Sequence, residues 1–201
     1  MKRFLTFLLL LMLPGLSFAA TILVWGDSLS AGYGLPQGTA WPTLLEQRLQ
    51  REGYRYQMVN ASISGETTAG GLARLPEALG RHKPAVIIIE LGANDGLRGQ
   101  ALTQMKENLA KMITSAQTNH AKVLLLGMRL PPNFGPVYTQ KFQSTYSELA
   151  SEYKTGLVPF FLEKIAAQPE MFQADTIHPI AQAQPIILDT IWPGIKPFLK
   201  K

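Results

Sequence analysis

The most reactive candidate in this sequence is a serine that follows an apolar run near the amino terminus. Ser28 is the third residue of Gly-Asp-Ser-Leu-Ser at positions 26–30, directly after the apolar residues 21–25. A serine hydroxyl held at the end of a strand acts as a nucleophile when a base lies beside it. Serine and aspartate are also favoured helix N-caps, so the alternative is a capped turn without a chemical role.

Two further groups could supply hydrogen-bond donors to the same place. Gly65 follows a second apolar run, and glycine can adopt a backbone conformation that turns its N–H toward a ligand. Asn94 follows the most apolar run, residues 84–91, and could aim its side-chain amide at the same point. The alternatives are an ordinary loop glycine and an asparagine that only holds its own turn.

The base follows by elimination, because the chain has only three histidines. His82 and His120 each precede an apolar run, which places them at the amino ends of strands. His178 follows the last apolar run, and Asp175 stands three residues before it. Within one tight turn this carboxylate can reach a ring N–H, which fixes the tautomer and leaves the other nitrogen free to take a proton from the Ser28 hydroxyl. The alternative is an Asp-capped helix with a surface histidine.

These groups meet only if the chain alternates strands and helices. Apolar, β-branched runs predict strands at residues 21–25, 54–59, 84–91, 122–127 and 156–160. Helical spacing predicts helices at residues 41–51, 72–79, 102–117 and 137–153, and a helical tail broken by Pro185, Pro193 and Pro197. The pattern predicts one α/β domain over residues 20–201, a three-layer, flavodoxin-like fold with a mostly parallel five-stranded sheet and helices on both faces. Ligands of such sheets bind outside the carboxyl ends of the strands, where every polar motif falls.

The first 19 residues have the composition of a secretory signal peptide. Lys2 and Arg3 precede an apolar run at residues 4–13, and small residues lead up to Ala19. We expect cleavage between Ala19 and Ala20. A single-pass anchor is the alternative, but a span needs roughly 20 apolar residues, and a proline and a glycine interrupt this run. The expectation is a periplasmic or secreted bacterial protein with no stable membrane anchor.

Composition and charge exclude several other classes of protein. The 201 residues include no cysteine, which excludes a disulfide scaffold and a cysteine-based zinc or redox site. Loss of the leader lowers the formal net charge from +5 to +3, and no basic cluster with interleaved aromatics is present, so we expect no nucleic-acid partner. One usable histidine leaves only carboxylates as metal ligands, so we expect no metal and no other cofactor. We expect a monomer.

Taken together, the four motifs resemble the sequence blocks of the GDSL or SGNH hydrolases. The matching residues are Gly-Asp-Ser-Leu at 26–29, Gly65, Gly-x-Asn-Asp at 92–95 and Asp-x-x-His-Pro at 175–179. The resemblance extends from about residue 21 to about residue 189. It is closest to the periplasmic multifunctional group of acyl-CoA thioesterases, lysophospholipases and arylesterases. Thr176, where that group often has glycine, and Ile180, where a polar residue is common, depart from the pattern.

The resemblance implies a serine hydrolase that cleaves aryl esters, acyl-CoA thioesters and lysophospholipids through an acyl-serine intermediate. It implies an oxyanion hole formed by the backbone N–H groups of Ser28 and Gly65 and the amide of Asn94. It also implies an acyl groove, with Gly96, Leu97, Leu130 and Pro131 as substrate-binding residues. The alternatives are a carbohydrate O-deacetylase on the same triad and a catalytically silent periplasmic domain that binds lipid or carbohydrate.

Ser30 and Asp27, on either side of the Ser28 motif, bear on which hydrolase fold and which catalytic residues we expect. The elbow of the α/β-hydrolases is Gly-x-Ser-x-Gly, and Ser30 stands where its second glycine is required. We expect Asp27 to be structural, with hydrogen bonds to the loops around Asn94, rather than to take a direct catalytic part.

Overall fold

Five parallel strands form the centre of the protein. The computed structural model describes residues 20–201, and the predicted leader, residues 1–19, lies outside them. The strands pair in the order β2-β1-β3-β4-β5, and every neighbouring pair is parallel. They are β1 (Ala20–Gly26), β2 (Tyr56–Asn60), β3 (Val86–Glu90), β4 (Lys122–Leu126) and β5 (Gly156–Val158). This is the strand order of a flavodoxin-like sheet, so the predicted fold class is confirmed.

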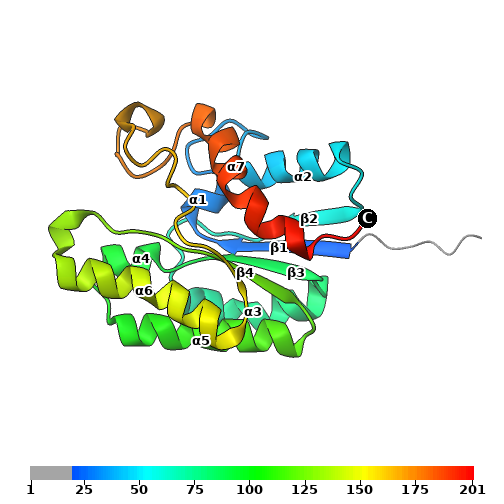
Figure 1. Cartoon of the computed structure of the whole chain (residues 1–201), viewed down its shortest axis with the longest axis horizontal. Coiled ribbons are helices and arrows are strands. Elements are labelled where there is room, and N and C mark those ends of the chain that lie inside the picture. Colours follow the sequence, from blue (N-terminus) through cyan, green and yellow to red (C-terminus); the bar gives the residue numbers. More distant parts are fainter. Residues whose placement is uncertain (1–19) are drawn as a thin grey trace, which may run out of the picture.

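Within the described residues, seven α-helices connect or follow these strands. They are α1 (Ser28–Ala31), α2 (Trp41–Arg51), α3 (Thr68–His82), α4 (Ala93–Leu97), α5 (Leu102–Thr118), α6 (Pro136–Tyr153) and α7 (Gln184–Ile195), with short 3-10 turns at η1 (Pro132–Phe134), η2 (Pro169–Met171), η3 (Ala181–Ala183) and η4 (Lys196–Phe198). Figure 1 shows α2 and α7 on one side of the sheet and α3, α5 and α6 on the other. No helix within residues 20–201 is both long and apolar enough to cross a membrane.

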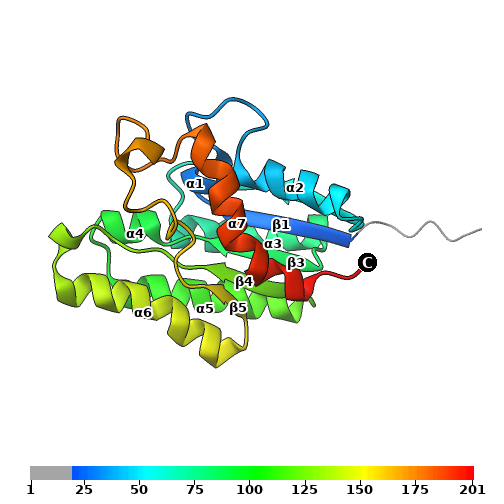
Figure 2. The same cartoon turned by 45° about the horizontal axis from the view of Figure 1, so that its top comes forward.

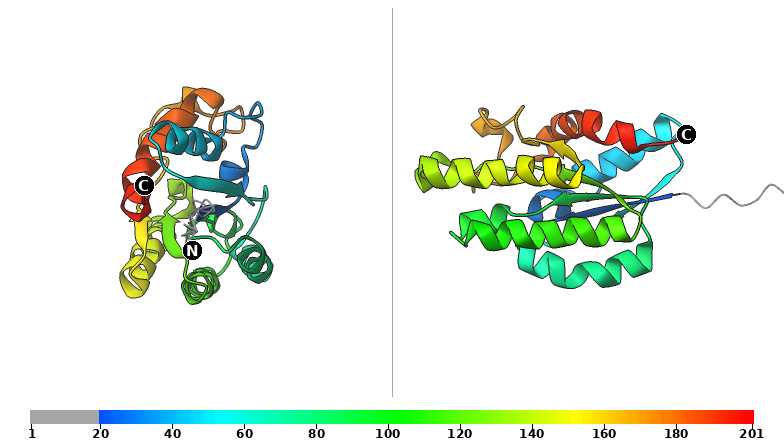
Figure 3. Two further views of the ribbon diagram at one scale, coloured as in Figure 1. Left: turned by 90° about the vertical axis from the view of Figure 1, so that its right-hand side faces the viewer. Right: turned by 60° about the horizontal axis from the view of Figure 1, so that its bottom comes forward.

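The core consists of two apolar layers, one on each face of the sheet. Successive side chains of a strand point to opposite faces. In β1, Ile22 and Val24 pack under α2 and α7, whereas Leu23 and Trp25 pack against the helices of the other face. Figure 3 shows the sheet end-on between the two layers of helices. Because both faces are covered, the central strands have the continuous apolar sequences from which they were predicted.

The helical tail differs from the prediction, because a single helix runs through Pro193. Pro185 lies in the first turn of α7, where backbone N–H groups have no acceptor within the helix, so its missing N–H costs no hydrogen bond. Pro193 cannot donate to the carbonyl of Asp189, but that carbonyl accepts a hydrogen bond from Lys164 Nζ at 3.4 Å instead. The predicted break at Pro193 is therefore wrong, and only Pro197 lies beyond α7, in η4.

Several other elements have different ends from those predicted. Strands β2 and β3 each begin two residues later than expected, at residues 56 and 86. The helix expected at 72–79 spans Thr68–His82, because Thr67 caps its amino end by accepting a hydrogen bond from the Gly70 N–H, and Pro76 lies on its exposed side. The strand expected at 156–160 ends at Val158. The carboxyl ends of β1, β2 and β3, which precede the candidate site residues, lie within one residue of their predicted positions. Figure 2 shows this edge of the sheet beside α1 and α4.

Candidate active site

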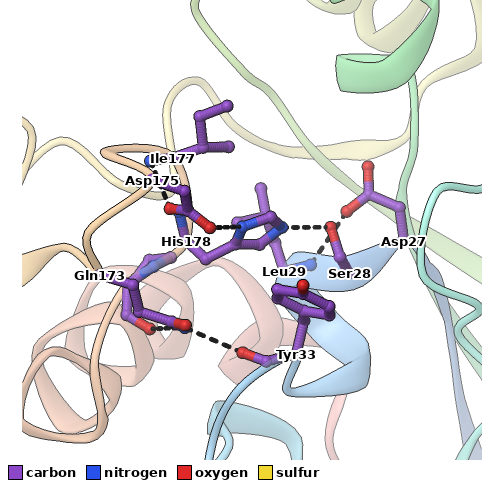
Figure 4. Close-up of polar contacts among 9 residues, drawn as sticks. Asp27, Ser28, Leu29, Tyr33, Gln173, Asp175, Ile177 and His178 are labelled. Atoms are coloured by element: carbon purple, nitrogen blue, oxygen red, sulfur yellow. Dashed lines mark hydrogen bonds and ion pairs between the residues drawn. The ribbon is translucent and has the colours of Figure 1, made fainter.

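Three side chains from opposite ends of the chain form a hydrogen-bonded series at the carboxyl edge of the sheet. Ser28 Oγ lies 2.8 Å from His178 Nε2, although 150 positions separate them. His178 Nδ1 lies 2.7 Å from Asp175 Oδ2. Figure 4 shows the serine, the imidazole and the carboxylate in line. In this arrangement, the carboxylate accepts the ring N–H and the other ring nitrogen faces the serine proton.

The strand-to-helix turn after β1 fixes the position of Ser28. Asp27 is the N-cap of α1, and its Oδ1 accepts the Leu29 N–H at 3.0 Å. The capped-turn alternative is thus also correct as a local description, since Ser28 is the first residue of this short helix. The Asn60 side chain donates to the carbonyl of Ser30 at 2.8 Å, which ties α1 to the end of β2.

The loop that carries the imidazole is held by its own backbone and by Asp175. Asp175 Oδ1 accepts the backbone N–H groups of Ile177 and His178, at 2.9 and 3.0 Å. These bonds, followed by the one from the His178 ring, lower the pKa of Asp175 from 3.8 to about 2. The carboxylate is therefore ionised throughout the neutral range. Thr176 adopts a φ of 61°, the left-handed conformation that glycine tolerates best.

Two residues that the sequence did not single out pack against this loop. The Tyr33 ring lies 4.6 Å from the His178 ring, centroid to centroid, at an angle of 42°. Gln173 Nε2 donates to the carbonyls of Tyr33 at 2.9 Å and Pro179 at 3.3 Å. Gln173 thus joins the segment after the candidate nucleophile to the segment of the candidate base (Figure 4). Both are ordinary polar loop residues in the sequence, and only the assembled fold brings their loops together.

The predicted donors face the same small cavity as Ser28 and His178. Its volume is about 210 Å³, and Gly65 and Asn94 are among its lining residues. Gly65 has a φ of 78°, and its carbonyl accepts a hydrogen bond from Arg98 Nη2 at 3.0 Å. Among residues 20–201, the backbone N–H groups of Ser28 and Gly65 have no acceptor. Three donors, counting the Asn94 amide, are thus available to a group bound in this cavity.

A buried polar cluster beneath α4 positions Asn94. The Asp95 carboxylate accepts the backbone N–H of Thr68 at 2.9 Å and also its hydroxyl. Asn108 Nδ2 donates to the same hydroxyl at 3.1 Å. All three side chains are buried, so these bonds connect α4 firmly to α3 and α5.

An apolar cleft of about 380 Å³ opens beside the small cavity. Four residues line both: Ala93, Leu97, Met128 and Ile177. Leu130 and Pro131 line this cleft, in the place expected of substrate-binding residues. Gly96 does not. Gly96 is buried, and a Cβ on it would lie 2.7 Å from Phe142 and 2.8 Å from Leu130. Gly96 therefore packs beneath the cleft, and the expectation that it contacts substrate is corrected.

Glu90, the last residue of β3, is a buried carboxyl group that the sequence analysis missed. Its side chain is 2% exposed, and its Oε2 accepts a hydrogen bond from Ser30 Oγ at 2.7 Å. Burial, followed by the charge of Asp27, raises the pKa of Glu90 well above 4.5. One sequence feature marks it: an acidic residue directly after four apolar residues, at the edge of the sheet where ligands bind.

The other titratable residues give no competing site within residues 20–201. His82 ends α3 and His120 precedes β4, so both lie at the opposite edge of the sheet, as elimination required. No group of three or more histidine, aspartate or glutamate side chains in these residues is placed to hold a metal ion.

Comparison with known proteins gives consistent matches over nearly the whole chain. Residues 24–184 match the GDSL-like lipase/acylhydrolase family. Esterase TesA of Pseudomonas aeruginosa is 53% identical over 192 residues, which cover 96% of each chain. Thioesterase 1/protease 1/lysophospholipase L1 of Escherichia coli is 42% identical over 196 residues, covering 97% of this chain and 93% of the relative. The crystal structure of the psychrotrophic esterase EstA from Pseudoalteromonas sp., inhibited by monoethylphosphonate, has a TM-score of 0.85 and 40% identity, covering 89% of this chain and 97% of that chain.

Proposed function

The chain belongs to the GDSL-like lipase/acylhydrolase family, and we propose that it hydrolyses esters and thioesters through an acyl group bound to Ser28. The observation that carries the proposal is the contact of 2.8 Å between Ser28 Oγ and His178 Nε2, beside an apolar cleft. Nucleophilic catalysis by serine requires such a base within hydrogen-bonding reach.

In the first half of the reaction, the Ser28 hydroxyl attacks the carbonyl carbon of the substrate while His178 Nε2 takes its proton. The tetrahedral intermediate collapses, and the imidazolium returns this proton to the leaving alcohol or thiol. Water then attacks the acyl-serine by the same route, which releases a carboxylic acid and regenerates the hydroxyl. Asp175 holds the ring orientation and stabilises the imidazolium, a role that its low pKa supports because the carboxylate stays ionised.

The developing negative charge on the carbonyl oxygen needs preorganised donors. We assign this role to the backbone N–H groups of Ser28 and Gly65 and the side-chain amide of Asn94. All three residues line the small cavity beside the imidazole, and the two backbone groups have no acceptor among the described residues.

The acyl chain of the substrate would lie in the cleft lined by Leu97, Met128, Leu130 and Pro131. A cleft of about 380 Å³ with apolar walls favours medium or long acyl chains over acetyl groups, because burial of each methylene contributes about 0.8 kcal/mol. This feature favours lipid esters and thioesters over acetylated carbohydrates. The names of the relatives, an esterase and a thioesterase/lysophospholipase, support the same substrate classes.

A hydrolysis panel tests the reaction and the substrate class together. Wild type and Ser28→Ala are assayed on p-nitrophenyl esters of increasing acyl length, acyl-CoA thioesters and lysophospholipids. We expect wild type to prefer the longer chains and Ser28→Ala to fold but lose nearly all activity and all labelling by a fluorophosphonate. A labelled Ser28→Ala variant would place the nucleophile elsewhere, and activity on acetyl substrates alone would exclude the acyl cleft.

We also propose that the chain is exported and that its leader is removed after Ala19. Support comes from the composition of residues 1–19: Lys2 and Arg3 precede an apolar run, and small residues stand at Ser17 and Ala19. Amino-terminal sequencing of protein from the periplasmic fraction should begin at Ala20. Full-length protein confined to the cytoplasm would contradict export. The monomeric state stays a prediction.

A further inference from the structure

Glu90 and Asp27 form a buried pair of carboxyl groups next to the proposed catalytic residues. The two residues are 2% and 1% exposed, and Glu90 Oε2 lies 3.3 Å from the backbone N of Asp27, which brings the two carboxyl groups close together. Within residues 20–201, neither of them has an ion-pair partner. Two buried carboxylates this close would repel strongly, so one of the pair must hold a proton.

The chain reserves space for the Glu90 side chain. β1 and β3 pair so that Gly26 lies opposite Glu90, and a Cβ at Gly26 would lie 2.7 Å from Glu90 Oε2 and 2.8 Å from Ser30 Oγ. Gly26, the first residue of the Gly-Asp-Ser-Leu motif, therefore leaves room for the Glu90 carboxyl group because it has no side chain. Glu90 Oε2 then accepts from Ser30 Oγ at 2.7 Å and from the Asp27 N–H at 3.3 Å.

The pair connects directly to the proposed oxyanion hole. Asp27 Oδ2 accepts a hydrogen bond from Asn94 Nδ2 at 3.0 Å, which uses one of the two amide hydrogens and fixes the direction of the other. The groups that face the pair are Tyr146 from α6, whose hydroxyl donates to the Leu91 carbonyl, and His178 beside Asp27. Both carboxyl oxygens of Asp27 already accept N–H groups, from Leu29 and Asn94 at 3.0 Å each, which favours the ionised form of Asp27. Burial raises the pKa of Glu90 well above 4.5, so we place the shared proton on Glu90.

We propose that Glu90 is a positioning residue for the oxyanion hole: as the neutral acid it donates a hydrogen bond to ionised Asp27, and Asp27 thereby holds the Asn94 amide in its catalytic direction. This inference rests on the proposed function, since it assigns a cause to the orientation of a group that the function requires. The same carboxyl group supports α1 through Ser30 and the Asp27 N–H.

The test is a double-mutant cycle with Asn94→Ala, read as kcat and KM on a p-nitrophenyl ester. Glu90→Leu should lower kcat about 10- to 100-fold with little change in KM, because a weakened oxyanion donor affects the transition state. In the Asn94→Ala background, Glu90→Leu should lower kcat less than about threefold, since its target is already gone. Equal losses in both backgrounds would overturn the proposal.

Glu90→Gln separates the neutral acid from an ionised carboxylate. An amide keeps a donor toward Asp27 and an acceptor toward Ser30, so this variant should recover at least about a third of the wild-type kcat at pH 7 to 8. A loss as large as that of Glu90→Leu would overturn the neutral-acid assignment. If Glu90→Leu does not fold, the Gln variant alone decides: a kcat of at least about a third of wild type supports the neutral acid, and a loss of about tenfold or more overturns it.

Two controls keep the test specific. Thr145→Val removes the hydroxyl of another buried polar residue, 3% exposed, that donates to the Lys141 carbonyl at 2.9 Å within α6, and it should leave kcat unchanged. Wild type and Ser28→Ala are measured in parallel. An inactive wild type or an active Ser28→Ala would refute the proposed function itself, whereas an additive cycle in an active wild type would refute only the role of Glu90.

Discussion

Asn94 performs two tasks with one amide group. One hydrogen is bonded to Asp27 at 3.0 Å, and the residue lines the cavity where the oxyanion is proposed to form. We predict that Asn94→Ala lowers kcat on the order of 10²- to 10³-fold and changes KM little, because the lost donor acts mainly in the transition state. Steady-state kinetics on a p-nitrophenyl ester measures both constants. A change confined to KM would remove Asn94 from the oxyanion hole.

Thr176 has an unfavourable backbone conformation in the loop of the proposed base. Its φ of 61° costs a β-branched residue roughly 1–2 kcal/mol, whereas glycine pays about 0.5–1 kcal/mol in entropy on folding. Thr176→Gly should therefore raise the free energy of unfolding, by up to about 1 kcal/mol, in urea denaturation. Thr114→Gly, the same change on the exposed side of α5, should lower it by a few tenths. Destabilisation by both substitutions would show that the left-handed backbone carries no strain.

At the residue scale, the sequence predicted the groups that spacing and elimination can find. Ser28, Asp175 and His178 were identifiable because each follows an apolar run or lies within one turn of its partner. Glu90 stands at the end of an apolar run, but its partners cannot be predicted from that position, because burial of a carboxyl group depends on what distant segments place over it, here Asp27 and Ser30. Gly96 was misassigned because a motif cannot show whether a glycine faces the cleft or the core beneath it.

At the scale of elements, the strands were predicted well and the helix ends poorly. Residues of the central strands are buried on both faces, so their sequences are uninterrupted apolar runs. The ends of helices depend on contacts that the local sequence pattern does not contain. Lys164 donates to the Asp189 carbonyl, which has no donor from Pro193, and Thr67 caps the amino end of α3.

Gln173 links two segments that the proposed reaction requires to keep a fixed distance: the one after Ser28 and the one that carries His178. Its amide donates to carbonyls of Tyr33 and Pro179, and its backbone N–H donates to the His178 carbonyl at 2.7 Å. Loss of the side-chain bonds should free the loop of the base, so we predict that Gln173→Ala lowers kcat about 3- to 10-fold, equivalent to roughly one net hydrogen bond.

The matched control for this prediction is Gln168→Ala. The Gln168 amide donates only to the Lys164 carbonyl within its own turn, so its loss should not change kcat. Equal kcat values for the two variants would mean that the tie to Tyr33 contributes nothing to the orientation of His178.

At the scale of the whole molecule, the sheet brings together groups that lie 150 positions apart. The strand order places the end of β1 near the loop before α7, and Gln173 joins the two segments. The distance therefore tests the fold and the site at once. The same assembly buries Asp27 and Glu90, and the cost of burying their charges is a property of the folded state as a whole. This cost makes the stability of the protein depend on pH.

The sign of that dependence follows from Asp27. Burial raises its pKa from 3.8 to about 6, so the folded protein binds this proton more tightly than the unfolded chain does. The resulting stabilisation is complete below about pH 4 and is lost as the pH rises through 6, an effect on the order of 2–3 kcal/mol. Asp27→Asn removes this titration and keeps an oxygen that can accept from Asn94. The unfolding free energy of wild type, minus that of Asp27→Asn, should therefore fall by about 2 kcal/mol between pH 4 and 7 in urea titrations.

Asp175 supplies the control of opposite sign. Its pKa is lowered to about 2, so its contribution is present above about pH 4 and is lost only at lower pH. In a His178→Gln background, where no imidazole titrates beside the carboxylate, the effect of Asp175→Asn on the unfolding free energy should thus stay constant from pH 5 to 7, where the difference for Asp27→Asn is still falling. Parallel flat lines for both variants would mean that Asp27 is no harder to ionise in the folded protein than in the unfolded chain. The inference that Asp27 and Glu90 share a proton would then be contradicted, because it depends on the same burial of the two carboxyl groups.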